Sequence, residues 1–146
     1  MSLADWAKNG WLRPHTPSKG EVKNLFEIVE RDLKDAVAKE ISDDWKFGIA
    51  YNAALKLCTI LLHTSGYRPE KNLAHYRTLQ ALPLILGDKH KANADYLDAC
   101  RKKRNETEYD FAGTVSKEEA QELINFCSEL KDEVSAWLKK NHKDLK

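Results

Sequence analysis

The segment from Ile49 to Leu62 is apolar around nearly the whole circumference of a helix, and it constrains the fold more than any other part of the sequence. A helix with so little polar surface must lie at the centre of a bundle, covered by other helices. A narrow polar strip interrupts its apolar surface and consists of Asn52, Lys56, Thr59 and His63. This strip is either a thin window to water or one wall of a cleft.

The rest of the chain repeats its apolar residues at helical spacing, and no run alternates apolar and polar residues over the length of a strand. We therefore predict an all-α fold, an antiparallel up-and-down bundle of four to five helices with short connections. After a short helix around Leu3 to Ala7, helices are expected from Thr16 or Ser18 to 37, at 43–65, 73–82 and 93–111, and after the Ser116–Glu119 capping box. Arg31 and Asp32 are expected on a solvent edge.

The length of 146 residues predicts one domain, 1–146, in which 1–17 form a short helix and loop and 140–146 form a basic tail that frays. The formal net charge of +1 gives no overall attraction to nucleic acid, so any such binding requires a local patch. Three widely spaced cysteines indicate buried thiols in a reducing cytoplasm. Neither a metal nor a cofactor is predicted, and the apolar segments are too short to cross a membrane.

The stretch CRKKRNETEYD, residues 100–110, places charged residues on the stripe of a helix whose centre is Leu97. Arg101, Arg104 and Glu108 fall on this stripe, whereas Lys102 and Lys103 are expected to face solvent. An unpaired guanidinium in a desolvated position costs several kcal/mol. Three explanations stay open: a buried ion pair, a subunit interface, or a water-filled cleft that receives an anion.

The Arg-Asn pair in RNETEYD resembles the signature of HEPN domains, a helical-bundle superfamily whose active members carry arginine, four to six residues, then histidine. The segments WLRPHTPSKGEVKNLFEIVERDLKDA and AYNAALKLCTILLHTSGYRPEKNLAHYRTLQAL resemble the entry helix and the central helices of that family. The resemblance implies a homodimer whose motif helices meet across a cleft. It also implies RNA or nucleotide binding, and metal-independent endoribonuclease activity in toxin-antitoxin or defence systems.

Carried onto this chain, the motif assigns catalytic positions to Arg104, Asn105 and Tyr109, with Tyr109 where the family has histidine. Tyrosine titrates near pH 10 and is a poor general base at neutral pH, so a weak or degenerate nuclease is expected. The neighbouring residues expected to bind RNA or a nucleotide are Arg101, Lys102, Lys103, Glu108 and Asp110.

Arg68 and His75 also match arginine, six residues, histidine, although Pro69 separates them from one helical face. This match is either chance or a second part of the site, if the loop folds over the bundle so that both residues approach Arg101 and Arg104. The alternative function is a non-catalytic dimeric interaction module that partners another protein, such as a nucleotidyltransferase or an antitoxin.

Overall fold

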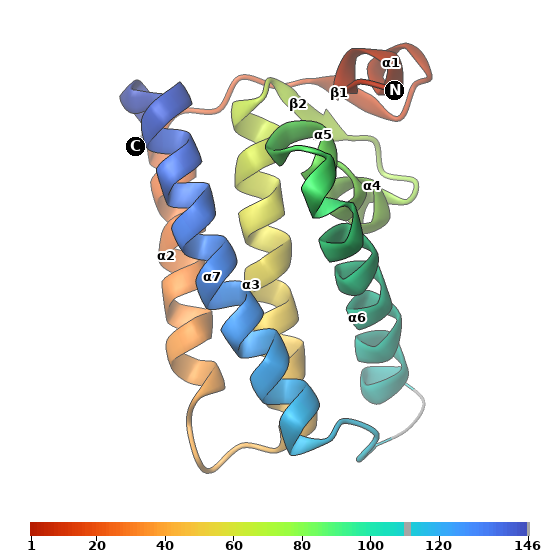
Figure 1. The fold of residues 1–146 in the computed structure, drawn as a ribbon, viewed down its shortest axis with the longest axis vertical. Helices are drawn as coiled ribbons and strands as arrows, with labels where there is room; N and C mark the ends of the chain where they lie inside the picture. The colour runs from red at the N-terminus through yellow and green to blue at the C-terminus, as the bar shows by residue number, and fades with distance from the viewer. Residues whose placement is uncertain (110–111, 146) are drawn as a thin grey trace.

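The computed structural model of the protein describes residues 1–109 and 112–145, and at Glu108 and Tyr109 it describes the backbone alone. Its centre is α3 (Asp43–Thr64), which packs against α2 (Lys19–Ala36), α7 (Lys117–Asn141) and α6 (Lys91–Tyr109). These long helices alternate in direction along the chain (Figure 1). The prediction of an all-α bundle around the segment from Ile49 to Leu62 is therefore confirmed, since Leu57, Ile60 and Leu61 are fully buried.

The helix ends follow the capping residues of the sequence. Ser42 accepts the backbone N–H of Trp45 at the start of α3, and Gly66, with φ of 99°, follows its end. Ser116 and Glu119 form the expected capping box at the start of α7. Such caps satisfy backbone groups that the helix itself leaves without partners.

The segment between α3 and α6 contains more structure than the sequence predicted. The helix α4 (Ala74–Gln80) is followed by α5 (Leu82–Leu86), with Pro83 in the first turn of α5, and by the 3-10 helix η1 (Asp88–His90). Proline is well tolerated in a first turn because its missing N–H has no helical partner there. Pro83 therefore begins a second short helix and does not simply end the first.

A short antiparallel ladder at one end of the bundle was not predicted. It pairs β1 (Leu12–Pro14) with β2 (Tyr67–Pro69), in a region expected to be loop. Two further bonds flank it, from His15 N–H to the Gly66 carbonyl at 2.9 Å and from Glu70 N–H to the Trp11 carbonyl at 3.0 Å. Each strand has three residues and contains a proline, so neither shows the alternation that identifies longer strands.

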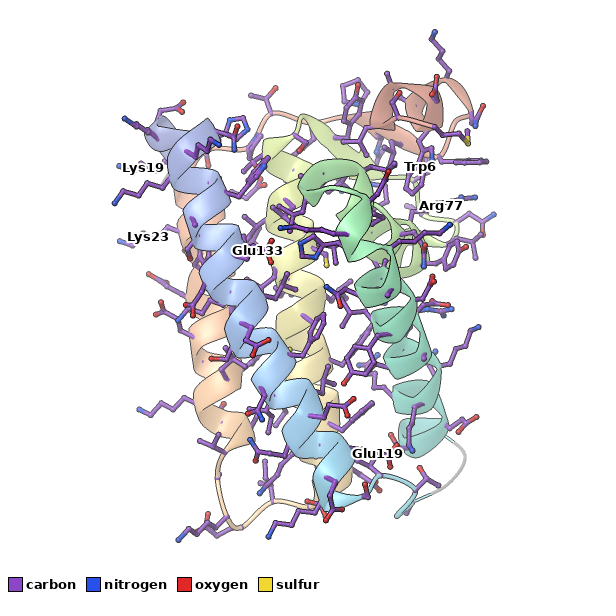
Figure 2. All side chains as sticks on the ribbon, viewed as in Figure 1. Trp6, Lys19, Lys23, Arg77, Glu119 and Glu133 are labelled. Atoms are coloured by element: carbon purple, nitrogen blue, oxygen red, sulfur yellow. The ribbon has the colours of Figure 1, made fainter. Side chains whose placement is uncertain are left out.

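The ladder holds the N-terminal helix α1 (Leu3–Lys8) against the bundle end, as Figure 1 shows. A second apolar cluster fixes it there, made of Trp6, Leu12, Leu62 and Ala81. The guanidinium of Arg77 lies 3.7 Å from the ring centre of Trp11 and 5.8 Å from that of Trp6, and Figure 2 shows Arg77 and Trp6 on the same side of the molecule. Cation–π contacts of this kind stabilise the junction further.

One expectation about exposure in α2 was wrong. Asp32 is only 5% exposed, because Asn52 of α3 donates to its carboxylate at 2.7 Å and Arg31 also donates to it. Toward the C-terminus, α7 continues to Asn141 and the 3-10 helix η2 (Lys143–Leu145) follows, so fraying of residues 140–146 stays a prediction.

The three cysteines are free thiols in the buried core, as expected: Cys58, Cys100 and Cys127. Among the described residues, no helix combines the length and apolar character needed to cross a membrane.

Candidate anion-binding pocket

A pocket of about 290 Å³ opens beside the ladder, and every ionisable side chain that lines it, within the described part of the chain, is basic. We call it the basic pocket. Its basic lining residues are Arg13, Lys56, His63, Arg68, Lys71 and His75. The remaining lining residues are Leu55, Thr59, Pro69, Ala74 and Thr78. Positive charge gathered in a concave site attracts anions even when the net charge of the chain is close to zero.

The register of the ladder places two of these charges directly opposite each other. Arg13 of β1 pairs with Arg68 of β2. Like charges in directly opposed positions destabilise a sheet. Glu70 lies 3.9 Å from Arg13, but both side chains are nearly half exposed, so this contact offsets little of the repulsion. A bound anion between the two guanidinium groups would remove it.

The polar strip of α3 forms one wall of the basic pocket, which decides between the two interpretations of that strip. Lys56, Thr59 and His63 all line the pocket. The Thr59 hydroxyl donates to the Leu55 carbonyl at 2.8 Å, which leaves its oxygen able to accept from a ligand. Asn52 does not take part, because its amide binds Asp32.

The part of the pocket that α4 contributes follows a residue with an unfavourable backbone conformation. Leu73, directly before α4, has φ of 58° and ψ of 31°, the left-handed region that residues with a Cβ rarely adopt. Its side chain is 55% exposed, so core packing does not explain the conformation. This turn places Ala74 and His75 on the pocket, and backbone strain of this kind is concentrated at functional sites.

His75 remains accessible to solvent while lining the basic pocket. Desolvation by the residues around its ring lowers the pKa of His75, and the positive charges of Arg104, Lys56 and Arg101 lower it further. Its imidazole is therefore largely neutral at pH 7 and can accept a proton. The same electrostatic effect means that the charges of Arg101 and Arg104 reach the pocket that Arg68 and His75 line.

The two arginines on the inward face of α6 lie in different environments. The Arg101 Nε donates to the Asp98 carboxylate at 2.8 Å, so the ion-pair explanation applies to Arg101. Arg104 lies with its guanidinium carbon 5.5 Å from the ring centre of Tyr51, a residue that is only 1% exposed. Burial raises the pKa of the Tyr51 hydroxyl, against the opposing effect of the nearby arginine charges.

The other predicted site residues are spread along α6. Lys102 is exposed and lies 3.5 Å from Asp98, whereas Asn105 is half-buried. Lys103 was wrongly expected to face solvent, since its ammonium donates to Glu119 in the first turn of α7, at the lower end of the bundle in Figure 2. The side chains of Glu108 and Tyr109, and the whole of Asp110, lie outside the described residues.

A cluster that the sequence analysis missed adjoins the basic pocket. The Glu21 carboxylate lies 2.9 Å from His15 Nε2 and 2.8 Å from His63 Nδ1. Burial alone would raise the pKa of Glu21, but its hydrogen bonds to both histidines leave that pKa lowered. His15, Glu21 and His63 come from three separate segments with no motif spacing. The only signal was Ser18-x-x-Glu21, which resembles an ordinary helix cap.

A larger cavity, of about 1000 Å³, lies at the opposite end of α3, but among the described residues the ionisable ones that line it are Asp43 and Asp44. Asp44 accepts the backbone N–H groups of Gly113 and Val115. Carboxylates here would repel a phosphate. The basic pocket is therefore the better candidate for binding an anion.

Comparison of the chain with protein-family models, with curated proteins and with solved structures gives no match.

The lowered pKa of His75 gives a first test of the pocket. In the free protein, we expect the pKa of the His75 imidazole to lie below its ordinary value of 6.5. Since the unfolded chain then binds the proton more readily, this group's contribution to stability is lost as the pH falls below about 6.5. Lys56→Ala should raise the pKa of His75, and so should added phosphate. NMR titration of the imidazole signals measures both changes, and an unchanged pKa in both experiments would contradict the assignment.

Proposed function

We propose that the protein is an RNA-binding domain of the HEPN type and that the basic pocket holds a backbone phosphate of single-stranded RNA. The observation that carries this proposal is the set of basic side chains around one pocket, with Arg13 and Arg68 opposed across the ladder. Arginine and lysine are the usual ligands of phosphate, and charge-assisted bonds to phosphate are strong. The resemblance of the sequence to HEPN domains is a second, independent support.

The size and surroundings of the pocket favour a polymer over a free nucleotide. A volume of about 290 Å³ accommodates one phosphate with part of its nucleoside. Positive charge extends beyond the pocket, because the charges of Arg101 and Arg104 on α6 act on His75. A charged path of this kind follows a nucleic acid backbone over several phosphates.

His75 is the residue of the basic pocket best suited to proton transfer. Attack by an RNA 2′-hydroxyl requires a group that accepts its proton and a cation that stabilises the phosphate charge. His75 is largely neutral at pH 7, and Arg68 shares its pocket. We therefore propose that His75 and Arg68 perform any cleavage, and the catalytic role of Arg104, Asn105 and Tyr109 stays a prediction from the resemblance.

The alternative, a non-catalytic module that binds a partner protein, is favoured by one contact. Arg101 is already paired with Asp98, as expected of a structural or interface arginine. A homodimer through α6 and its neighbours fits either function and stays a prediction. Partners such as an antitoxin or a nucleotidyltransferase belong to the same untested part of the resemblance.

Binding and cleavage of a labelled, mixed-sequence single-stranded RNA in the presence of EDTA test the proposal. We expect Arg68→Ala to weaken binding by about 1–3 kcal/mol, which is about 5- to 150-fold in the dissociation constant. It should also reduce the salt slope of binding by about one unit. Lys140→Ala is the matched control, because it removes one positive charge from the exposed last turn of α7.

Two further variants separate the candidate sites. If the pocket holds the phosphate, Arg68→Ala weakens binding more than Arg104→Ala, and His75→Gln removes cleavage while leaving most of the binding. If Arg104→Ala alone weakens binding, RNA binds at the motif helix and not in the basic pocket. Absence of binding by the unmodified protein would leave the interaction module as the function.

A further inference from the structure

We propose that His15, Glu21 and His63 form a binding site for a divalent transition-metal ion of the Zn²⁺ type. This proposal does not depend on the RNA proposal, because it rests on different side chains and a different chemistry. His63 is common to the metal cluster and to the lining of the basic pocket, so the two sites adjoin.

The three ligand atoms already lie at distances close to those that a metal requires. His15 Nε2 is 2.9 Å from the nearer Glu21 oxygen, His63 Nδ1 is 2.8 Å from the same oxygen, and all three atoms lie within 4.8 Å of one another. Ligands that bind Zn²⁺ at about 2.0–2.1 Å are about 3.3 Å apart in a tetrahedral site. To admit an ion, the two His–Glu distances must lengthen by about 0.5 Å, and the distance between the two histidine nitrogens, which is at most 4.8 Å, must reach the same value by side-chain rotation.

The backbone brings the two histidines together from separate segments. His15 follows β1, and its N–H donates to the Gly66 carbonyl at 2.9 Å, directly beyond the end of α3. His63 lies in the last turn of α3, and its ring centre is 4.4 Å from that of His15. The side chains of His15 and His63 are 19% and 17% exposed, so an ion from solvent can reach the cluster while most of each ring stays covered by protein.

Glu21 departs from the role that its position predicts. It is the third residue of α2, and its backbone N–H is capped by the Ser18 hydroxyl. In the equivalent positions of α1 and α7, Asp5 and Glu119 turn back to the backbone N–H of the capping serine and complete a capping box. The Glu21 carboxylate turns to the two histidines instead. The α2 cap is therefore left half formed in favour of a His₂Glu cluster.

The donor set identifies the class of ion. Two imidazole nitrogens and one carboxylate suit Zn²⁺ and its neighbours, whereas Mg²⁺ and Ca²⁺ require mainly oxygen ligands. The adjoining pocket contains Arg13, Lys56 and Arg68, so ordinary electrostatic attraction does not favour a cation here. Binding must come from coordination by the imidazoles. Three protein ligands leave a fourth position open for water or a substrate atom, as in catalytic zinc sites.

The competing explanation is a hydrogen-bond network in which Glu21 simply accepts from two imidazole N–H groups. The two explanations differ in a measurable way, because a metal must replace the protons at His15 Nε2 and His63 Nδ1. The experiment uses the full, tag-free chain, stripped with EDTA and then desalted. Co²⁺ is added as a spectroscopic substitute for Zn²⁺, and Zn²⁺ binding is measured by calorimetry.

We expect one Zn²⁺ per chain, and Co²⁺ d–d bands without a thiolate charge-transfer band, which excludes the cysteines. Glu21→Gln and His63→Gln should each weaken Zn²⁺ binding by at least about tenfold. His90→Gln is the matched control, because His90 also contacts a glutamate, Glu133 of α7 at 2.7 Å, but among the described residues it belongs to no His₂Glu cluster. It should leave Zn²⁺ binding unchanged.

A measurement on the unmodified chain keeps the test decisive if a variant fails to fold. Zn²⁺ should shift the imidazole ¹⁵N signals of His15 and His63 and leave those of His90 in place. The proposal is overturned if no ion binds stoichiometrically, or if binding persists in both ligand variants. RNA binding in EDTA is a separate readout, so failure of the metal site leaves the RNA proposal standing.

Discussion

Leu61→Asp is expected to abolish soluble expression of the protein. Leu61 of α3 is fully buried, with 0% of its surface exposed, and it belongs to the main core cluster. The substitution removes a large apolar side chain and buries a carboxylate among apolar neighbours. A loss above about 4 kcal/mol is a large part of the 5–15 kcal/mol that stabilises an ordinary domain.

Leu73→Asp is the matched control, because it makes the same chemical change at an exposed leucine. Leu73 is 55% exposed and has a positive φ, a conformation that aspartate tolerates better than leucine does. We expect this variant to be as stable as the unmodified protein or slightly more stable. Soluble yield and urea denaturation compare the two. Similar behaviour of Leu61→Asp and Leu73→Asp would contradict the central position of α3.

Asp32→Ala is expected to lower the free energy of unfolding by about 2–3 kcal/mol. Asp32 is 5% exposed and accepts the Asn52 amide at 2.7 Å, so its removal leaves a half-buried amide without that partner. The Arg31 contact contributes little to this loss, because the Arg31 side chain is 63% exposed. Chemical denaturation measures the change.

Asp35→Ala, on an exposed position of the same helix, controls for the effect of removing a carboxylate from α2. Its effect should stay within about 0.5 kcal/mol. A double variant that also replaces Asn52 by leucine should recover part of the loss, because the amide that lost its partner is then absent. Equal effects of Asp32→Ala and Asp35→Ala would show that the hydrogen bond from Asn52 to Asp32 contributes nothing to the free energy of unfolding.

The helices of this fold could be predicted because their signals are local. The apolar circumference of the segment from Ile49 to Leu62 identified the central helix, and Ser42, Ser116 and Gly66 marked helix ends that the structure confirms. Each of these signals depends on residues within a few positions of one another. The same approach could not find the ladder, whose three-residue strands are separated by the whole of α2 and α3.

The exposure of charged side chains was predicted less well. Helical periodicity shows which way a side chain points from its helix, but not which residue of another helix it meets there. Asp32 was placed at a solvent edge, although Asn52 of α3 meets it from 20 positions away. Lys103 was placed in solvent, although Glu119 of α7 receives it. In both cases a polar partner on another helix made a partly buried charge acceptable.

The candidate site was predicted in part. The polar strip of α3 was recognised as a potential cleft wall, and Arg68 and His75 were expected to approach Arg101 and Arg104 only if the loop folded over the bundle. Both residues line the basic pocket. The cluster of His15, Glu21 and His63 escaped prediction, because its three segments meet only through the ladder and the bond from His15 to Gly66.

Because Arg13 and Arg68 oppose each other in the ladder, the stability of the ladder depends on whether an anion is bound between them. An anion that stabilises the closed ladder is also bound more tightly when the ladder is closed. The gain in ladder stability and the gain in anion affinity are the same coupling free energy. Opening of the ladder would break the flanking bonds of His15 and Glu70. Hydrogen exchange at those two amides should therefore slow as phosphate is added, so that the backbone of residues 11–15 reports how far the basic pocket is filled.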